Sequence, residues 1–211
     1  MKLTYLGHSC FLLEAEDGTR LVTDPYTGVG YEMPPVSAEY VCCSHGHFDH
    51  DFVRGVRGAQ KIVRGTGEFA CGAFRLRGIA SFHDEVEGAK RGLNTVYCIE
   101  CDGVRVCHMG DIGTLPEPAL VREIGACDVL LVPCGGTYTV DAEGAAKWVR
   151  ALSPRVAVGM HFRPADGTLD ISDESGFLRA VGGERLARAS LEATDLKLLA
   201  GKAVTLERTR E

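Results

Sequence analysis

A six-residue run with four potential metal ligands constrains this chain most: His45-Gly46-His47-Phe48-Asp49-His50. It follows the apolar run 40–43, which predicts a buried strand with the cluster on the loop at its C-terminal end. The alternating spacing lets His45 and His47 face one metal ion while Asp49 and His50 turn to a second. Imidazole nitrogens and carboxylate oxygens suit Zn²⁺, Mn²⁺ or Fe²⁺. A polar surface loop is the alternative interpretation, but ligand clusters this dense have few purely structural uses.

Further potential ligands directly follow other apolar runs: His83, Asp111 and His161. In open α/β sheets, functional groups gather in the crevice outside the carboxyl ends of the strands. Taken alone, each of these residues would be interpreted as a cap or a turn residue. Together with the first cluster, they predict one crevice that collects ligands from four places in the chain.

Length and composition indicate one globular domain, residues 1–211. Hydrophobic residues make up 45% and charged residues 25%, an ordinary balance for such a domain. The formal charge of -6 comes without a basic run, which argues against general nucleic-acid binding. No segment has the apolar length of a membrane span, and the first residues lack the apolar core of a signal peptide. We therefore expect a cytoplasmic protein, and we leave open whether it is a homo-oligomer.

Hydrophobic patterning predicts many short strands and few helices. Strands are expected over residues 2–6, 10–15, 20–23, 40–44, 61–63, 72–76, 78–82, 94–101, 104–108, 128–132, 155–160, 196–199 and 203–206. Helices are expected from 51 to about 55, over 116–124, after a cap at Thr139 or Asp141, and over 172–181. Residues 16–19 predict one hairpin connection, and Asp102-Gly103 predicts a type I′ turn in another.

The nine cysteines are scattered through apolar runs, which is typical of reduced thiols that pack as small hydrophobes. Cys98-Ile99-Glu100-Cys101 has the spacing of a redox motif. It lies within an expected strand, however, where a separation of three residues places the two side chains on opposite faces. The spacing alone is therefore weak support for a redox or metal-binding role.

Taken together, these motifs resemble those of the metallo-β-lactamase superfamily of metal-dependent hydrolases. The family motif His-x-His-x-Asp-His is matched in full at residues 45–50, and the resemblance extends from Asp24 through Gly110-Asp111 to His161. It implies an α/β (α+β) fold, a four-layer αββα sandwich with a two-metal site at one edge. Segments 6–9, 132–136 and 160–162 look more specifically like the branch of ascorbate-phosphate lactonase and N-acyl-phosphatidylethanolamine phospholipase D relatives.

The resemblance also implies roles for the matching residues. The ligands of the first metal would be His45, His47 and His83. Those of the second would be Asp49, His50 and His161, with Asp111 bridging the two. Asp24 would support the ligand loop through hydrogen bonds, since metal-bound histidines need orienting partners. His108 competes with His83 for the first site, although a packed histidine is its more ordinary interpretation.

Two such cations, with Zn²⁺ favoured over Mn²⁺ or Fe²⁺, can share and ionise a water that attacks a carbonyl carbon or a phosphorus. The expected function is hydrolysis of a lactone, an ester or a phosphodiester in a small-molecule substrate, phosphorylated or not. His8 is either a proton donor to the leaving group or a strand-end histidine bonded to the backbone. Arg91 and Arg163 could clamp a phosphate, and Tyr138 could line the pocket.

Two other functions stay open. Iron-binding relatives of this fold carry out oxidoreduction, but in their di-iron electron-transfer branch a glutamate usually stands where this chain has His47, and a flavin domain usually follows. A non-catalytic regulatory protein could also keep the metals without turnover. The complete ligand set argues weakly against that interpretation.

Overall fold

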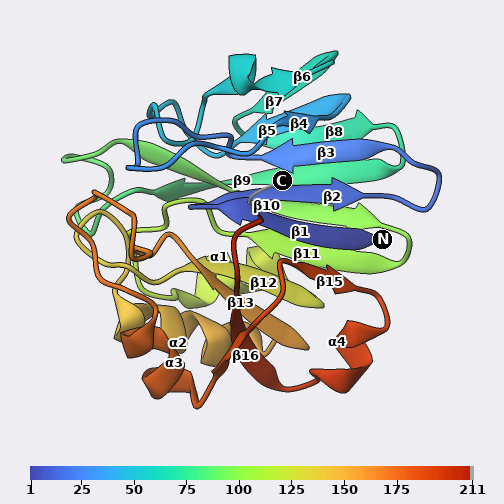
Figure 1. The fold of residues 1–211 in the computed structure, drawn as a ribbon. Helices are drawn as coiled ribbons and strands as arrows, with labels where there is room; N and C mark the ends of the chain where they lie inside the picture. The colour runs from blue at the N-terminus through green and yellow to red at the C-terminus, as the bar shows by residue number, and fades with distance from the viewer. Residues whose placement is uncertain (210–211) are drawn as a thin grey trace.

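Two stacked β-sheets dominate the computed structural model, which describes residues 1–209 (Figure 1). The first sheet contains, in spatial order, β15 (Ser190–Glu192), β1 (Lys2–Gly7), β2 (Cys10–Glu14), β3 (Arg20–Thr23), β5 (Tyr40–Cys43) and β7 (Lys61–Arg64). The second contains β14 (Glu184–Leu186), β16 (Lys202–Leu206), β13 (Val156–Met160), β12 (Val129–Pro133), β11 (Val104–His108), β10 (Leu93–Cys101), β9 (Phe74–Phe82) and β8 (Gly67–Cys71). A small parallel pair joins β4 (Val36–Ser37) to β6 (Val56–Arg57).

Three strands of the first sheet, β1, β3 and β5, are buried on both faces, toward which their successive side chains point in alternation. Leu3 and Leu21 belong to the core that the two sheets share, whereas Val22 and Val41 belong to a second core on the outer face. The side chains that cover this outer core come from loops and from the small sheet: Tyr26, Val29, Val36, Ala38 and Val56. A segment with several prolines and glycines runs through this outer layer, in keeping with its loop structure.

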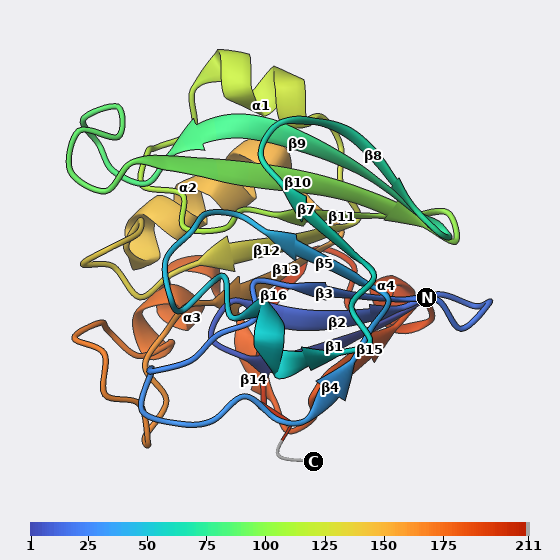
Figure 2. The same ribbon diagram turned by 90° about the horizontal axis from the view of Figure 1, so that it is seen from above.

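The outer face of the second sheet is covered by three helices, α1 (Pro118–Ile124), α2 (Ala142–Leu152) and α3 (Ser175–Val181) (Figure 2). Asp141 caps α2, since its side chain accepts a hydrogen bond from the Gly144 backbone N–H at 2.8 Å. Trp148 is fully buried on the inner side of α2, and its indole N–H donates to the Thr114 carbonyl at 2.8 Å. The helix predictions for residues 116–124 and 172–181 are confirmed, each with a slightly later start.

Both predicted hairpins are present. β2 pairs with β3, and β10 pairs with β11. Asp102 and Gly103 have φ values of 51° and 74°, as a type I′ turn requires.

Three local predictions are wrong. Residues 51–55 form no α-helix, only the 3₁₀ turn η1 (Val53–Gly55) that leads into β6. Residues 74–82 form one long strand, β9, instead of two strands over 72–76 and 78–82, and residues 72 and 73 lie in the turn before it. Hydrophobic patterning misses β8, before that turn, because four of its five residues are not fully buried. Residues 196–199 lie in or directly after the short helix α4 (Asp195–Leu198) rather than in a strand.

Loops after β1, β3, β5, β9, β11 and β13 gather at one edge of the two sheets, on the left in Figure 1. Within the first sheet, β3 and β5 are parallel, and β1 has the same direction because β2 is antiparallel to both of its neighbours. The same reasoning gives β9, β11, β12 and β13 one direction in the second sheet. No helix among residues 1–209 has the length and apolarity needed to cross a bilayer.

Candidate metal centre

The ligands expected from the sequence converge at this edge. Side chains from the loop after β5 meet others from the ends of β9, β11 and β13, so that all seven predicted ligands lie in adjoining groups: His45, His47, His83, Asp49, His50, Asp111 and His161. Within each group the potential ligand atoms lie within 4.8 Å of one another. The first group contains His45, His47 and His83. The second contains Asp49, His50 and His161, together with His8.

The carboxylate of Asp111 lies between the two groups. Its Oδ2 atom is 3.3 Å from Nε2 of His83 on one side. On the other side it is 3.2 Å from Nε2 of His50 and 3.2 Å from Nε2 of His161. A single carboxylate oxygen is therefore within reach of histidines from both groups, as a bridging ligand would have to be.

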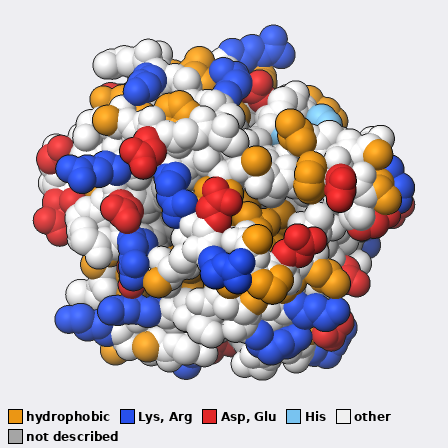
Figure 3. All heavy atoms as spheres, turned by 180° about the vertical axis from the view of Figure 1, so that it is seen from behind, with side chains coloured by type: hydrophobic (Ala, Val, Ile, Leu, Met, Phe, Trp, Pro, Cys, Tyr) orange, Lys and Arg blue, Asp and Glu red, His pale blue; other side chains and the backbone are white. Residues whose placement is uncertain are grey.

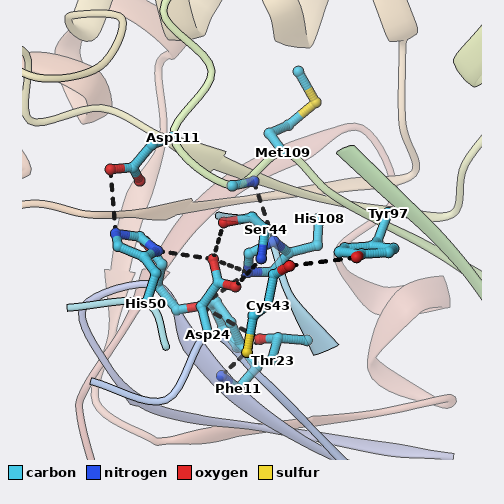
Figure 4. Close-up of polar contacts among 12 residues, drawn as sticks. Phe11, Thr23, Asp24, Cys43, Ser44, His50, Tyr97, His108, Met109 and Asp111 are labelled. Atoms are coloured by element: carbon cyan, nitrogen blue, oxygen red, sulfur yellow. Dashed lines mark hydrogen bonds and ion pairs between the residues drawn. The ribbon is translucent and has the colours of Figure 1, made fainter. Parts of the chain in front are cut away.

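Asp24 orients the loop that carries the His45–His50 motif, as Figure 4 shows. Its Oδ1 accepts a hydrogen bond from the Ser44 backbone N–H at 2.7 Å, and its Oδ2 accepts one from Ser44 Oγ at 2.6 Å. The same Oδ2 lies 2.8 Å from Nδ1 of His50. Since Nδ1 of His50 is engaged by Asp24, its Nε2 is directed toward Asp111.

Several buried polar atoms of this cluster have no hydrogen-bonding partner among the described residues: Nε2 of His45 and His50, Nδ1 of His83, Oδ1 of Asp111, and both ring nitrogens of His161. Buried polar groups in proteins are nearly always paired, and convergent imidazole and carboxylate atoms without partners are the donor set of a metal site. The residues present therefore fit divalent cations. His47 is the exposed member of the set, and Figure 3 shows a histidine at the surface beside hydrophobic side chains.

Electrostatics prepare part of the set for metal binding. Burial, and then the neighbouring His161, lower the pKa of His8 to about 4. Burial, and then the charge of His50, lower the pKa of His45 to about 3. For His50, burial acts downward, but Asp111 and Asp24 outweigh it and raise the pKa. His8 and His45 are therefore neutral near pH 7, the form in which an imidazole binds a metal.

Comparison with known proteins agrees with this geometry. The beta-lactamase superfamily domain matches residues 2–161. The chain belongs to the metallo-β-lactamase superfamily. It is 30% identical over 192 residues to a UPF0173 metal-dependent hydrolase of Carboxydothermus hydrogenoformans, covering 77% of this chain and 84% of the relative. A UPF0173 metal-dependent hydrolase of Archaeoglobus fulgidus is 29% identical, with 77% and 83% covered.

A solved structure agrees as well. A candidate Zn-dependent hydrolase of the metallo-β-lactamase superfamily from Thermotoga maritima superimposes with a TM-score of 0.80, at 33% identity and 98% coverage of both chains. Within the superfamily, the present chain is thus a metal-dependent hydrolase of the UPF0173 family. The fold expected from the sequence is confirmed.

In this superfamily member, His83 and His108 occupy different environments. His83 faces the cluster through Nε2, whereas His108 is fully buried beneath it. Nε2 of His108 lies 2.8 Å from the Ser9 carbonyl, and Nδ1 accepts a hydrogen bond from the Gly110 backbone N–H at 3.1 Å. His108 belongs to none of the ligand groups found among the described residues, so its position is that of a packed histidine.

His8 and His161 are held in strained backbone conformations. Their φ values are 53° and 51°, in the left-handed region that residues other than glycine rarely adopt. The His161 backbone N–H donates to the His8 carbonyl at 2.9 Å, and the two rings lie 4.1 Å apart between centroids. Nε2 of His8 is 3.1 Å from Oδ2 of Asp49. The backbone of His8 is thus hydrogen-bonded at the strand end, and its side chain lies within the ligand cluster.

The two predicted phosphate-binding arginines lie apart from each other. Arg91 Nη2 donates to the Thr137 carbonyl at 2.9 Å, and its guanidinium lies 5.6 Å from the ring centre of Tyr138, linking two loops at the rim. Arg163 lines a cavity of about 1200 Å³ together with Asp173 and Arg208, and none of the clustered histidines lines that cavity. Arg163 also lines a small pocket beside His8, so both arginines remain candidates for contact with an anionic group.

Asn94 is a site residue that the sequence analysis missed. It is buried at the start of β10, and its Oδ1 accepts a hydrogen bond from the Asp111 backbone N–H at 2.9 Å. A side chain at Gly110 would collide with Asn94 and Ser44, so glycine is required for this close approach. The available signal was a lone asparagine in an otherwise strand-forming run, since strands are depleted in asparagine.

Proposed function

We propose that this metal-dependent hydrolase uses two divalent cations, zinc in preference to manganese or iron, to hydrolyse a lactone, an ester or a phosphodiester in a small molecule. The observation that carries the proposal is the position of Asp111 Oδ2, 3.2 Å from Nε2 of His50 and 3.3 Å from Nε2 of His83. One carboxylate oxygen between two histidine groups is the arrangement expected of a bridge between two cations.

Each cation has its own set of residues in this proposal. The first would be held by His45, His47 and His83, the second by Asp49, His50 and His161, and Asp111 would contact both. When bound, such a pair of cations supplies an ionised water at neutral pH and offsets negative charge on the oxygen under attack. Because the chain provides these groups, no serine or cysteine nucleophile is required.

The supporting residues hold this arrangement before substrate arrives. Asp24 fixes His50, Ser44 lies 2.9 Å from Nδ1 of His45, and Asn94 fixes the backbone of Asp111. His50 and Asp111 are almost fully buried, so their charges act in a region of low polarity where electrostatic effects are stronger than in water. The chain's contribution is therefore orientation of the ligands and exclusion of solvent around them.

His8 is our candidate proton donor to the leaving group; because it is neutral near pH 7, it would first take up a proton from the attacking water and then pass it on. Its contact with Asp49 offers an alternative role in orienting that ligand. The His8→Gln variant separates the two. A proton donor should matter most for poor leaving groups, with rates falling about 100-fold for alkyl esters and much less for nitrophenyl esters, at unchanged metal content. Loss of metal, or equal losses across the series, would assign His8 to ligand support.

We also propose a closer relation to the branch of ascorbate-phosphate lactonase and N-acyl-phosphatidylethanolamine phospholipase D relatives. The three segments that resemble this branch meet at the site. His161 bonds to His8, and the Cys134 backbone N–H donates to the Met160 carbonyl at 3.0 Å. Arg91 is one candidate contact for an anionic substrate group. The Arg91→Ala variant should lose activity selectively on phosphorylated substrates, and equal loss on neutral esters would remove this assignment.

A single experiment tests the proposed function. The protein is stripped with a chelator, reloaded with Zn²⁺, Mn²⁺ or Fe²⁺, and assayed for bound metal and for hydrolysis of lactones, carboxylic esters and phosphodiesters. We expect two equivalents of metal and turnover of at least one substrate class, both reduced in Asp111→Asn. Iron with visible absorbance and no hydrolysis would favour oxidoreduction. Full metal loading without turnover would favour a regulatory protein.

A further inference from the structure

A second cluster of reactive side chains lies on the far side of the eight-stranded sheet. A groove of about 830 Å³ between β9–β11 and the end of α1 is lined by Cys98, Cys107 and Cys127. None of the clustered histidines of the metal centre lines this groove. The three thiols are therefore independent of the proposed hydrolytic site.

The strand register makes Cys98 and Cys107 direct partners. They lie opposite each other on the antiparallel strands β10 and β11. Opposed residues on such strands have Cα atoms about 4.5–5.5 Å apart, within the range of roughly 4.4–6.8 Å that a disulfide spans. Cys101, which shares the redox-motif spacing with Cys98, pairs with Val104 instead and is buried toward the other face of the sheet.

Cys98 has the surroundings of a reactive thiol. It is only partly buried, and Arg77 Nη2 donates a hydrogen bond to its sulfur at 3.8 Å. The hydrogen bond from the Cys107 thiol lowers the pKa of Cys98, burial opposes this, and Arg77 adds to the lowering. Cys107 is fully buried, and hydrogen bonding with Cys127 and Cys98, together with burial, raises its pKa. The pair is thus asymmetric, with one accessible nucleophile and one protected thiol.

We propose that Cys98 and Cys107 form a redox-active pair that a hydroperoxide converts to a disulfide and a small thiol reduces again. The Cys98 thiolate attacks the terminal peroxide oxygen and the O–O bond breaks; with one proton this gives a sulfenic acid at Cys98 and water from hydrogen peroxide. The Cys107 sulfur then attacks the Cys98 sulfur, the S–O bond breaks, and the Cys107 proton leaves with the hydroxyl group as water. Two thiols are oxidised, and one peroxide is reduced to two waters.

The test uses the full chain, reduced, loaded with zinc and exposed to one equivalent of hydrogen peroxide before free thiols are blocked with N-ethylmaleimide. Trypsin separates Cys98, in peptide 92–105, from Cys107, in peptide 106–122. We expect these two peptides to become linked, and the link to disappear on treatment with dithiothreitol. Oxidation spread over all nine cysteines, or a link that joins Cys107 to the peptide of Cys127, would overturn the proposal.

Variants assign the two roles. Cys101 shares peptide 92–105 with Cys98, so Cys101→Ser is the matched control and should still form the link. Cys107→Ser should stop at a Cys98 sulfenic acid that dimedone traps, and Cys98→Ser should give neither product. Arg77→Gln should slow oxidation of Cys98 about fivefold by reducing its thiolate fraction. The roles of Cys98 and Arg77 would be contradicted by an unchanged oxidation rate in Arg77→Gln together with a peptide link that persists in Cys98→Ser. If a variant does not fold, the peptide map of the wild-type protein still tests whether Cys98 and Cys107 become linked.

Discussion

The side-chain carbonyl of Asn94 accepts a hydrogen bond from the backbone N–H of Asp111 at 2.9 Å. Its amide group donates to Ser81 Oγ at 2.8 Å and to the Met109 carbonyl at 2.9 Å. Asn94 thereby ties the end of β9 and the start of β10 to the loop that presents the candidate bridging carboxylate. The position of that carboxylate therefore depends on an uncharged residue 17 positions earlier in the chain, which contacts the backbone of Asp111.

Replacing Asn94 should affect both stability and metal binding. In Asn94→Leu the three buried partners lose their hydrogen bonds, so we expect the free energy of unfolding to fall by about 2–3 kcal/mol. Metal affinity should fall roughly 10–100-fold, because the Asp111 backbone is no longer fixed. Ser81→Ala is the matched control, since it removes one partner of Asn94 and leaves the bond to Asp111. Calorimetric zinc titration and urea unfolding measure the two effects, and unchanged affinity in Asn94→Leu would refute the positioning role.

The backbone conformation of Asp24 allows its effect on metal binding to be separated from its effect on stability. Its φ of 39° is tolerated by asparagine but strained for alanine. Asp24→Asn should therefore mainly weaken metal binding, roughly 10–100-fold, through loss of the carboxylate that holds His50. Asp24→Ala should in addition lose about 1–3 kcal/mol of stability from backbone strain and unpaired Ser44. The prediction fails if both variants bind zinc as the wild type does.

Replacing His83 and replacing His108 should have different effects on the amount of zinc that the protein binds. His83→Ala should bind about one equivalent of zinc less than the wild type, since its Nε2 faces Asp111. His108→Ala should keep the full metal content, but unfold about 2–3 kcal/mol more easily, because the Ser9 carbonyl and the Gly110 N–H lose a buried partner. Elemental analysis of desalted protein gives the count. The opposite pattern would exchange the two assignments.

Asp195 leads to a prediction on pH. Its carboxylate accepts hydrogen bonds from the Glu192 backbone N–H and from Arg188 Nη1, each at 2.8 Å. Burial acts upward on the pKa of Asp195, but these two partners outweigh it and lower the pKa. A lowered folded-state pKa means that the stabilisation is present above the unfolded value of about 3.9 and is lost as pH falls through the folded value.

We therefore expect Asp195→Asn to be about 0.5–1 kcal/mol less stable than the wild type at pH 6, a small value because Arg188 is exposed and solvent screens the pair. The difference should shrink below about pH 4. Urea midpoints at pH 6 and pH 3 measure it. Glu207→Gln, which alters an exposed contact to Arg185 at 3.8 Å, should shift neither midpoint measurably. A difference for Asp195→Asn that grows toward low pH would contradict the sign.

Local features of this protein could be predicted from short stretches of its sequence. The Asp102-Gly103 turn and the helix cap expected at Thr139 or Asp141 each depend on residues close together in the chain, and the structure has that turn and a cap at Asp141. The candidate ligands of the His45–His50 motif are likewise close in the chain, and they lie in adjoining groups. The failures are short elements whose stability comes from tertiary contacts. α4 and the edge strands β14 and β15 have only three or four residues each, too few to show a hydrophobic period.

The sequence by itself determined which residues are candidate metal ligands and which strand ends they follow, because ligand chemistry and strand periodicity are properties of short segments. Only the tertiary structure decided that Asp111 lies between two histidine groups, that Asn94 fixes its backbone, and that Cys98 faces Cys107 rather than Cys101. Those relationships arise from strand register and from the packing of two sheets. Both are set by the burial of apolar side chains from the whole chain, which no short stretch of sequence contains.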